Sequence, residues 1–278
     1  MLRLMEIPLK MPEHTRIHPA MGSIFHGALM SIIAPASAEM YHHMTLRPYS
    51  QAVYWNERKH SALWRIGTLT DEAYERLVIP LEKVPALWLK QKQYEVTLGP
   101  RQLIGQTSFE DLAGQFVKAD SAPAGAEWQC LSVMSFKQDG RYVILPDIRL
   151  MYHSLLQRWN TFSDTVKLEQ DDLLEQLVSH CRLTKYQLRS QVFSVNGSAI
   201  YGCEGWQRYS FFGYDMLKRL QGILAALAPF SGMEPAFIFY AITILIKSSF
   251  ILRLKWNNAN GIRICIPVAL TTSSRDAL

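Results

Sequence analysis

Two adjacent histidines stand close to an arginine in the stretch "YHHMTLRPYS", residues 41–50. A histidine with a pKa near 6.5 can act as a general base or a general acid at neutral pH. The guanidinium group of Arg47 offers a fixed positive charge and a fork of donors that fits a phosphate. The stretch could therefore serve proton transfer at a phosphate ester. Alternatively, His42 and His43 simply favour the C-terminus of a helix through its dipole.

Metal and thiol chemistry have little support in the sequence. The four cysteines are far apart with no CxxC pair, so neither a zinc site nor a disulfide framework is indicated. No HExxH motif and no cluster of carboxylates occurs, which argues against a two-metal nuclease. We expect no cofactor and no metal. The first residues, "MLRLMEIPLK", do not resemble a secretion signal, so a cytoplasmic location is expected.

The totals allow one large domain or two ordinary ones, because 278 residues with 49% hydrophobic side chains can fill a core for either. The net charge is +5, but residues 1–233 are nearly balanced, with 24 basic and 22 acidic residues. Charge alone therefore does not indicate a nucleic acid partner. A basic surface would have to come from a local cluster, such as Arg182, Lys185 and Arg189.

The elements that must position the histidines follow a recognisable order. Residues 2–9 alternate as a strand, residues 24–34 have apolar positions at helical spacing, and residues 36–43 form a second short helix. The later elements are strands at 49–58 and 61–70, a helix at 71–84 and a strand at 91–99. This β-α-β-β-α-β order is the split βαβ unit.

The same alternation repeats after a small, polar stretch at 118–127, which we interpret as a linker. The expected elements are strands at 128–136 and 141–145, helices at 146–159 and 170–181, strands at 185–195 and 206–213, and a helix at 214–230. Pro146 is expected to start its helix. The prediction from the residues is an α+β protein with two similar units in tandem, at 1–122 and 123–278. The apolar run 236–246 is too short to span a membrane.

Five segments, in this order, resemble one known family. They are "FHGALM" at 25–30, "YHH" with "RPYS" at 41–50, "VILPDIRLMYHSLLQRWNTFSD" at 143–164, "TKYQLRSQVF" at 184–193 and "LAPFSGM" at 227–233. Together they look like the CRISPR-associated Cas6 endoribonucleases of the RAMP superfamily, with the closest similarity to members from Gram-positive type III systems. The resemblance implies that the two α+β units are tandem ferredoxin-like (RRM-type) domains. It further implies metal-independent cutting of repeat RNA in the precursor transcript, with attack by a 2′-hydroxyl that leaves a 2′,3′-cyclic phosphate. It also suggests a type III effector complex as a partner.

The resemblance separates the two histidines. In the family, the catalytic histidine precedes a Pro-aromatic turn at a spacing that falls here on His42, and the basic partner falls on Arg47. His26, on the first helix, then has an assisting role, orienting His42 or the phosphate, or alternatively is a half-buried histidine that only packs. His43 is left as helix-end surface.

The resemblance weakens after Met233. The family continues into a glycine-rich loop that contacts RNA, because glycines let backbone N–H groups approach phosphates. Here only Ser231 and Gly232 match the beginning of that loop, and we expect them to contact RNA together with Arg182, Lys185 and Arg189. The apolar residues that follow could still provide an altered last strand of the second domain.

Two alternatives to an RNA-cutting enzyme stay open. One is a non-catalytic repeat-RNA-binding protein of the same architecture, which would fit the missing loop. The other is an assembly protein with no RNA contact, which the lack of a basic groove beside His42 would favour.

Overall fold

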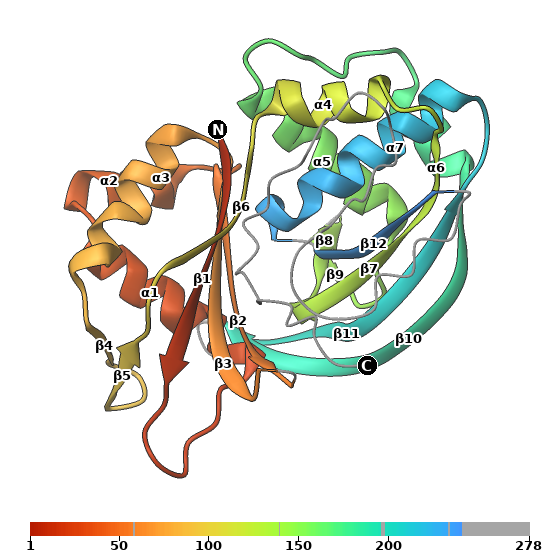
Figure 1. Ribbon diagram of the computed structural model, residues 1–278. Helices are drawn as coiled ribbons and strands as arrows, with labels where there is room; N and C mark the ends of the chain where they lie inside the picture. The colour runs from red at the N-terminus through yellow and green to blue at the C-terminus, as the bar shows by residue number, and fades with distance from the viewer. Residues whose placement is uncertain (58, 139, 196–197, 233, 241–278) are drawn as a thin grey trace, which may run out of the picture.

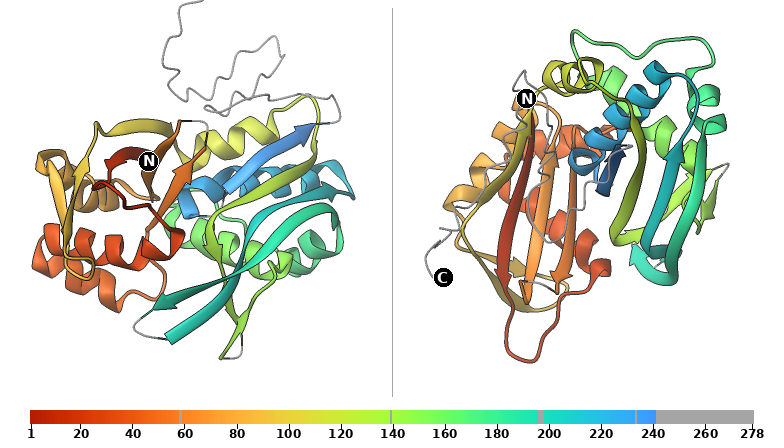
Figure 2. Two further views of the ribbon diagram at one scale, coloured as in Figure 1. Left: turned by 90° about the horizontal axis from the view of Figure 1, so that it is seen from below. Right: turned by 45° about the vertical axis from the view of Figure 1, so that its right-hand side comes forward.

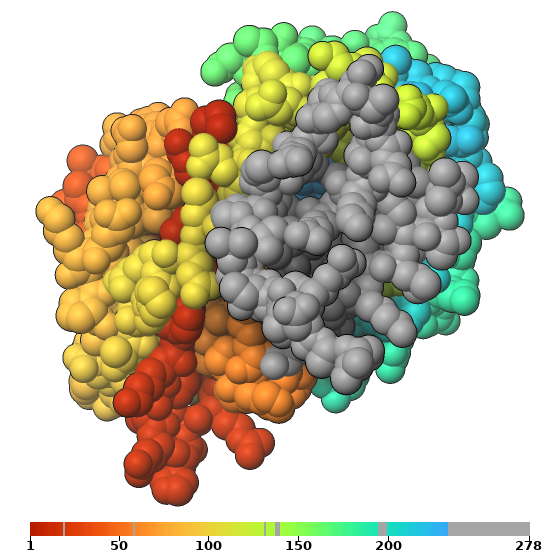
Figure 3. Space-filling model, in the orientation of Figure 1, coloured from red at the N-terminus to blue at the C-terminus, as the bar shows by residue number. Residues whose placement is uncertain are grey.

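The computed structural model describes residues 1–57, 59–138, 140–195, 198–232 and 234–240. It contains two large antiparallel sheets, each with helices on one face (Figure 1). In the space-filling view, the first unit, coloured red to yellow, adjoins the second, coloured green to blue (Figure 3).

The first sheet has the order β2-β3-β1-β5-β4, and β6 also pairs with β1. Its strands are β1 (Leu2–Lys10), β2 (Tyr49–Asn56), β3 (Ser61–Thr68), β4 (Ala86–Leu89), β5 (Tyr94–Leu98) and β6 (Gln102–Thr107). The helical elements of this half are η1 (Pro19–Met21), α1 (Gly22–Ile32), α2 (Pro35–His43), α3 (Asp71–Leu77), η2 (Ile79–Lys83) and α4 (Phe109–Val117). The strands β2, β3, β1 and β6 have the order of a ferredoxin-like sheet.

The second sheet has the order β10-β11-β7-β12, which repeats that of the first. Its strands are β7 (Pro123–Met134), β10 (Cys181–Val195), β11 (Ser198–Phe211) and β12 (Glu234–Tyr240), and β8 (Phe136–Gln138) forms a separate hairpin with β9 (Arg141–Val143). The helical elements are α5 (Ile148–Phe162), α6 (Leu173–Ser179), α7 (Asp215–Leu227) and η3 (Ala228–Ser231). The predicted class, α+β with tandem ferredoxin-like units, is confirmed.

The second unit closes with a strand that follows the point where the family resemblance weakens. β12 pairs antiparallel with β7 and fills the fourth position of the sheet. Residues 234–240 of the apolar tail therefore supply the altered last strand that the sequence suggested. Residues 241–246 of the predicted apolar run, and the turn at Asn196 and Gly197, lie outside the described residues.

Three details of the prediction were wrong. The strand at 91–99 is not the fourth strand of the first unit, because β4 and β5 form an additional hairpin and β6 takes that place. The stretch 118–127 is not all linker: β7 begins at Pro123, and its Ala126 is completely buried. Pro146 does not start the helix, since the Asp147 side chain accepts hydrogen bonds from the backbone N–H groups of Arg149 and Leu150 and acts as the N-cap of α5.

The two units share buried surface. One core lies between the first sheet and α1, α2 and α3, and includes Phe25, Trp64 and Ile66. The other core contains residues of α4, α5, α6 and α7, but also Leu2 and Leu4 from the opposite face of β1. The first sheet is therefore covered on both faces at this end. The helix α7 of the second unit lies between the two sheets (Figure 2). The division at 122/123 stays a proposal.

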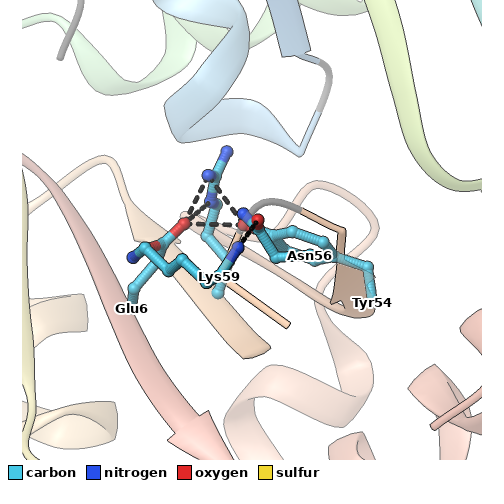
Figure 4. Close-up of polar contacts among 5 residues, drawn as sticks. Glu6, Tyr54, Asn56 and Lys59 are labelled. Carbon is cyan, nitrogen blue, oxygen red and sulfur yellow. Dashed lines mark hydrogen bonds and ion pairs between the residues drawn. The ribbon is translucent and has the colours of Figure 1, made fainter. Parts of the chain in front are cut away.

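A buried acid lies on the same face of the first sheet as Leu2 and Leu4. Glu6 is completely buried and accepts hydrogen bonds from the Tyr54 hydroxyl at 2.6 Å and from Lys59 Nζ at 3.0 Å. Arg65, its cross-strand neighbour, also pairs with it. Figure 4 shows these polar groups converging from β1, β2 and the turn that follows β2. Burial would raise the pKa of Glu6, but the Arg65 charge and the hydrogen bonds outweigh burial, so its pKa is lowered and the carboxylate stays charged.

Candidate active site and RNA-binding surface

The helix α1 places His26 beside the buried stripe of the first unit. Phe25 and Leu29 point into the core, and His26, one position from Phe25, is half-buried. Its Nε2 atom lies 2.9 Å from the hydroxyl of Tyr49, and the two rings are nearly parallel. His26 is therefore held in one orientation by a hydrogen bond and by packing.

Tyr49, the first residue of β2, connects α1 with α2. It is buried, and its ring meets the Tyr41 ring of α2 edge to face at a centroid distance of 5.0 Å. Burial raises the pKa of Tyr49, and the positive charge of Arg47 opposes this only in part. The Tyr49 hydroxyl thus stays protonated at neutral pH and can hydrogen-bond His26.

The histidine pair lies in the last turn of α2. Pro35 occupies the first turn, where its missing N–H costs nothing, and the helix ends at His43. His42 and His43 are both exposed, with ring centroids 5.6 Å apart. Both are accessible to a substrate, and both also stand where a positive charge interacts favourably with the helix dipole.

The turn between α2 and β2 fixes Arg47. Its Nε atom donates to the carbonyl oxygen of Tyr41 at 2.9 Å, and its own carbonyl oxygen accepts a hydrogen bond from Arg158 Nη1 at 2.8 Å. The first bond uses one of the five guanidinium donors. The guanidinium group can therefore present its remaining donors to a phosphate.

Electrostatic interactions link the three predicted catalytic residues, His26, Arg47 and His42. The pKa of His26 is lowered by burial, and further by the positive charges of Arg47 and His42. A His26 ring with a lowered pKa is neutral at neutral pH, and it can accept or donate a hydrogen bond without adding charge. The arrangement thus combines an exposed imidazole, a neutral imidazole and a fixed cation, the groups needed to move a proton beside a phosphate.

Ser231 and Gly232 line a cavity between the two units. The turn that contains them packs so closely on β3 that a Cβ atom on Gly67 would lie 2.5 Å from the Phe230 carbonyl oxygen. Ser231 is buried, and Gly232 adopts a left-handed conformation with φ of 82°. Both line a cavity of about 240 Å³ together with Ser50, Arg158 and other residues of both units.

The three basic residues predicted to bind RNA share one face of β10. A bulge near Thr184 brings Lys185 opposite Arg208 and keeps it on the face of Arg182 and Arg189. Lys185 is exposed, Arg182 lies over the Phe212 ring at 5.2 Å, and Arg189 pairs with Glu204 through its Nε atom at 2.9 Å. The Arg189 charge is therefore partly compensated within the protein.

This basic face lies near the loop that precedes the His26 helix. The η1 turn, directly before α1, packs against β7 and β10. Burial raises the pKa of Glu204, but the hydrogen bonds that Glu204 accepts from Arg189 and Gln191, and the charges of Arg189 and His18, outweigh burial and lower it. His18 belongs to the loop that contains η1. The basic strand and the histidine site are thus connected through one short segment of the first unit.

Sequence reasoning missed two residues of the site. From the sequence, Tyr49 was used only to locate the Pro-aromatic turn, and Arg158 was only one residue of the family-like segment 143–164. The alternation of β2 could have indicated that Tyr49 points inward, toward the helices. Nothing in the local pattern of α5 indicates that Arg158 reaches the Arg47 turn, because that contact joins residues 111 positions apart.

The described residues contain no group of three or more His, Cys, Asp or Glu residues arranged to hold a metal ion. Among them, no helix is both long and apolar enough to cross a bilayer.

Comparisons with known proteins agree with this architecture. Residues 129–233 match the family model described as CRISPR-associated endoribonuclease Cas6. Proteins named CRISPR-associated endoribonuclease Cas6 are similar over 226 residues. The one from Streptococcus thermophilus is 25% identical, with 78% of this chain and 88% of the relative covered, and the one from Mycobacterium tuberculosis H37Rv is 27% identical, with 79% and 69% covered.

Solved structures share the fold. Thermus thermophilus Cas6 superposes with a TM-score of 0.64 at 20% identity, covering 84% of this chain and 98% of the other. A Cas6 product complex superposes with a TM-score of 0.65 at 23% identity, covering 84% and 94%. By fold, the protein is thus of the class built from two tandem ferredoxin-like units. Within that class, the chain is similar to the CRISPR-associated endoribonucleases named Cas6.

Proposed function

We propose that the protein is an endoribonuclease that cuts CRISPR repeat RNA within the precursor transcript, without a metal ion. The observation that carries the proposal is that Arg47, fixed by its bond to the Tyr41 carbonyl oxygen, and His42 both act electrostatically on the half-buried His26. Similarity to CRISPR-associated endoribonucleases named Cas6 supports repeat RNA as the substrate. The guide RNA released in this way would be passed to a type III effector complex in the cytoplasm.

In the proposed reaction, the oxygen of a ribose 2′-hydroxyl attacks the neighbouring phosphorus atom, and the bond from phosphorus to the 5′-oxygen breaks. The 2′-hydroxyl proton goes to a base, and the departing 5′-oxygen gains a proton from an acid. The products are a 2′,3′-cyclic phosphate and a 5′-hydroxyl end.

His42 acts as the base or the acid, since it is the exposed imidazole of the site. Arg47 stabilises the negative charge that develops on the non-bridging phosphate oxygens. His26, whose Nε2 is engaged by Tyr49, positions these groups.

The direct test is incubation of the protein with its own repeat RNA in excess EDTA, with the product ends analysed by mass spectrometry. We expect a single cut and a cyclic phosphate. A matched RNA with a 2′-deoxy residue at the cut position should bind but stay intact, because the nucleophile is missing. Cleavage of the deoxy substrate, or a complete dependence on added metal, would contradict the mechanism. Binding without any cleavage would instead support a non-catalytic RNA-binding protein.

A further inference from the structure

The cavity between the two units is lined by apolar and polar side chains, including two arginines. The residues that line it come from β2 and β3 of the first unit and from β7, α5 and η3 of the second. Its volume of about 240 Å³ is several times the roughly 30 Å³ that one water molecule occupies in the liquid. The described lining residues include two arginines, Arg65 and Arg158, and no aspartate or glutamate. The cavity can therefore hold a group much larger than water, in a positive environment.

Unused donors gather in the same lining. Arg158 Nε, Trp128 Nε1 and Ser231 Oγ are buried and have no hydrogen-bond partner within the described part of the chain. Buried polar groups are nearly always satisfied in native proteins, so three unpaired atoms around one cavity indicate an absent partner. The arginine and tryptophan atoms can only donate, and the serine hydroxyl can donate as well. The missing partner must accept hydrogen bonds.

The charge of Arg158 also requires an anion. Burial lowers the pKa of Arg158, because a buried cation loses its hydration. Among the described residues, its hydrogen-bond acceptor is a neutral group, the carbonyl oxygen of Arg47. Arg65, across the cavity, is by contrast compensated by Glu6. A bound anion would compensate the buried Arg158 charge and would accept the unused hydrogen bonds.

The location of the cavity indicates which kind of anion it would bind. Arg158 lines the cavity and, through Nη1, holds the turn that carries Arg47. A chain of phosphates crossing the Arg47 turn would therefore place a neighbouring phosphate at the mouth of the cavity. We propose that this cavity is a subsite for an RNA phosphate next to the one being cut, with Arg158 and Trp128 as its donors. This inference rests on the proposed function, because it takes the Arg47 turn as the place of cutting.

The test measures binding rather than cleavage. Repeat RNA carrying a 2′-deoxy residue at the cut position is titrated by fluorescence anisotropy between 50 and 200 mM salt, with wild type, Arg158→Gln and Arg149→Gln. Each phosphate contact contributes roughly one unit to the slope of log affinity against log salt concentration. We expect Arg158→Gln to lower that slope by about 1. Arg149, on the same helix, pairs with the exposed Glu175, so Arg149→Gln should keep the wild-type slope.

Two further variants separate a phosphate contact from a general effect on folding. Arg158→Lys keeps the charge and should restore most of the slope. Trp128→Phe keeps the ring but removes the N–H donor, and should weaken binding several-fold with an unchanged melting temperature. If Arg158→Gln fails to fold, these two variants decide the question. A wild-type slope in Arg158→Lys would then support the proposal only if Trp128→Phe binds more weakly, and unaltered binding by Trp128→Phe would overturn it.

The outcomes also distinguish this inference from the proposed function. If the wild type cuts RNA but folded Arg158→Gln keeps the full slope, the subsite is wrong and the function stands. If the wild type binds but never cuts, while the slope falls in Arg158→Gln, the cavity binds an RNA phosphate, but the proposed function, and with it the cut beside that phosphate, is wrong. Inorganic phosphate is tested alone by thermal shift. An increase in melting temperature that needs Arg158, combined with an unchanged RNA slope, would show a site for a free anion and would contradict the proposal.

Discussion

The hydroxyl of Tyr49 lies 2.9 Å from Nε2 of His26, inside the apolar layer between α1 and β2. This bond fixes the half-buried histidine relative to the turn that carries Arg47. Substituting Tyr49→Phe should reduce the free energy of unfolding by about 1 kcal/mol, the typical net value of one hydrogen bond. It should also lower the single-turnover rate of RNA cleavage, because His26 loses its fixed orientation.

The matched control for this substitution is Tyr214→Phe. The Tyr214 hydroxyl also lies 2.9 Å from its acceptor, Gln176 Oε1, but that pair is exposed and belongs to the second unit. The control should leave the cleavage rate unchanged. Equal rate losses in both variants, measured under saturating protein, would show that the His26–Tyr49 bond has no special role.

The stability of the protein should depend on pH through His26. Its folded-state pKa lies below the ordinary value near 6.5, first because of burial and then because of Arg47 and His42. The unfolded chain therefore binds the proton more readily than the folded chain. The contribution of His26 to stability is complete above about pH 6.5 and declines as the pH falls below that value toward the folded-state pKa.

Urea unfolding at pH 7.5 and pH 5.0 tests this dependence. Wild type should lose more free energy of unfolding between the two pH values than His26→Gln, because glutamine does not titrate. Other titrating groups are common to both proteins and cancel in the comparison. Identical losses would mean that His26 is protonated as easily in the folded protein as in the unfolded one.

Removing the charge of Glu6 should strongly destabilise the first unit. Glu6→Gln leaves Lys59 and Arg65 beside a neutral side chain in a buried setting, and breaking a buried pair in this way costs roughly 3 kcal/mol. Glu72→Gln is the control, because Glu72 forms an exposed i,i+4 pair with Arg76, which contributes less than about 1 kcal/mol. Chemical denaturation of both variants should separate them clearly, and a loss in Glu6→Gln as small as in the control would contradict the network shown in Figure 4.

The fold was largely predictable, because hydrophobic alternation and helical spacing report which face of each element is buried. The order of strands repeats in both halves, as expected. The hairpin β4–β5 was not foreseen because β5 also pairs with the end of β1, so a strand assigned from its local pattern took the place that belongs to β6. Likewise, Pro123 and the small residues after it resemble a linker, although packing against α7 places them in a central strand.

The site was predictable in part. The family resemblance in residues 41–50 led to His42 and Arg47, which are close in sequence. Tyr49 and Arg158 act through contacts across 23 and 111 positions, and no local pattern encodes such pairs. The basic residues of β10 share a face, as the cluster suggested, but the sequence could not show that Glu204 compensates Arg189.

That compensation leads to a prediction for RNA binding. Lys185 is exposed on the basic face, whereas Arg189 is engaged by Glu204. Lys185→Ala should reduce the slope of log affinity against log salt concentration by about 1, and Arg189→Ala should change it by less. Anisotropy titrations at several salt concentrations measure both slopes. A larger change in Arg189→Ala would show that the arginine leaves Glu204 to contact the RNA.

The assignment of the chemistry to His42 is tested most directly by comparing His42→Ala with His43→Ala. Both residues are exposed in the last turn of α2, so either substitution removes the same kind of helix-end interaction. The measurement is the single-turnover rate of repeat-RNA cleavage in EDTA, at equal RNA occupancy. Loss of general acid or base catalysis should slow His42→Ala by at least about 100-fold, whereas His43→Ala should stay near the wild-type rate. Wild-type cleavage by His42→Ala would contradict the central assignment.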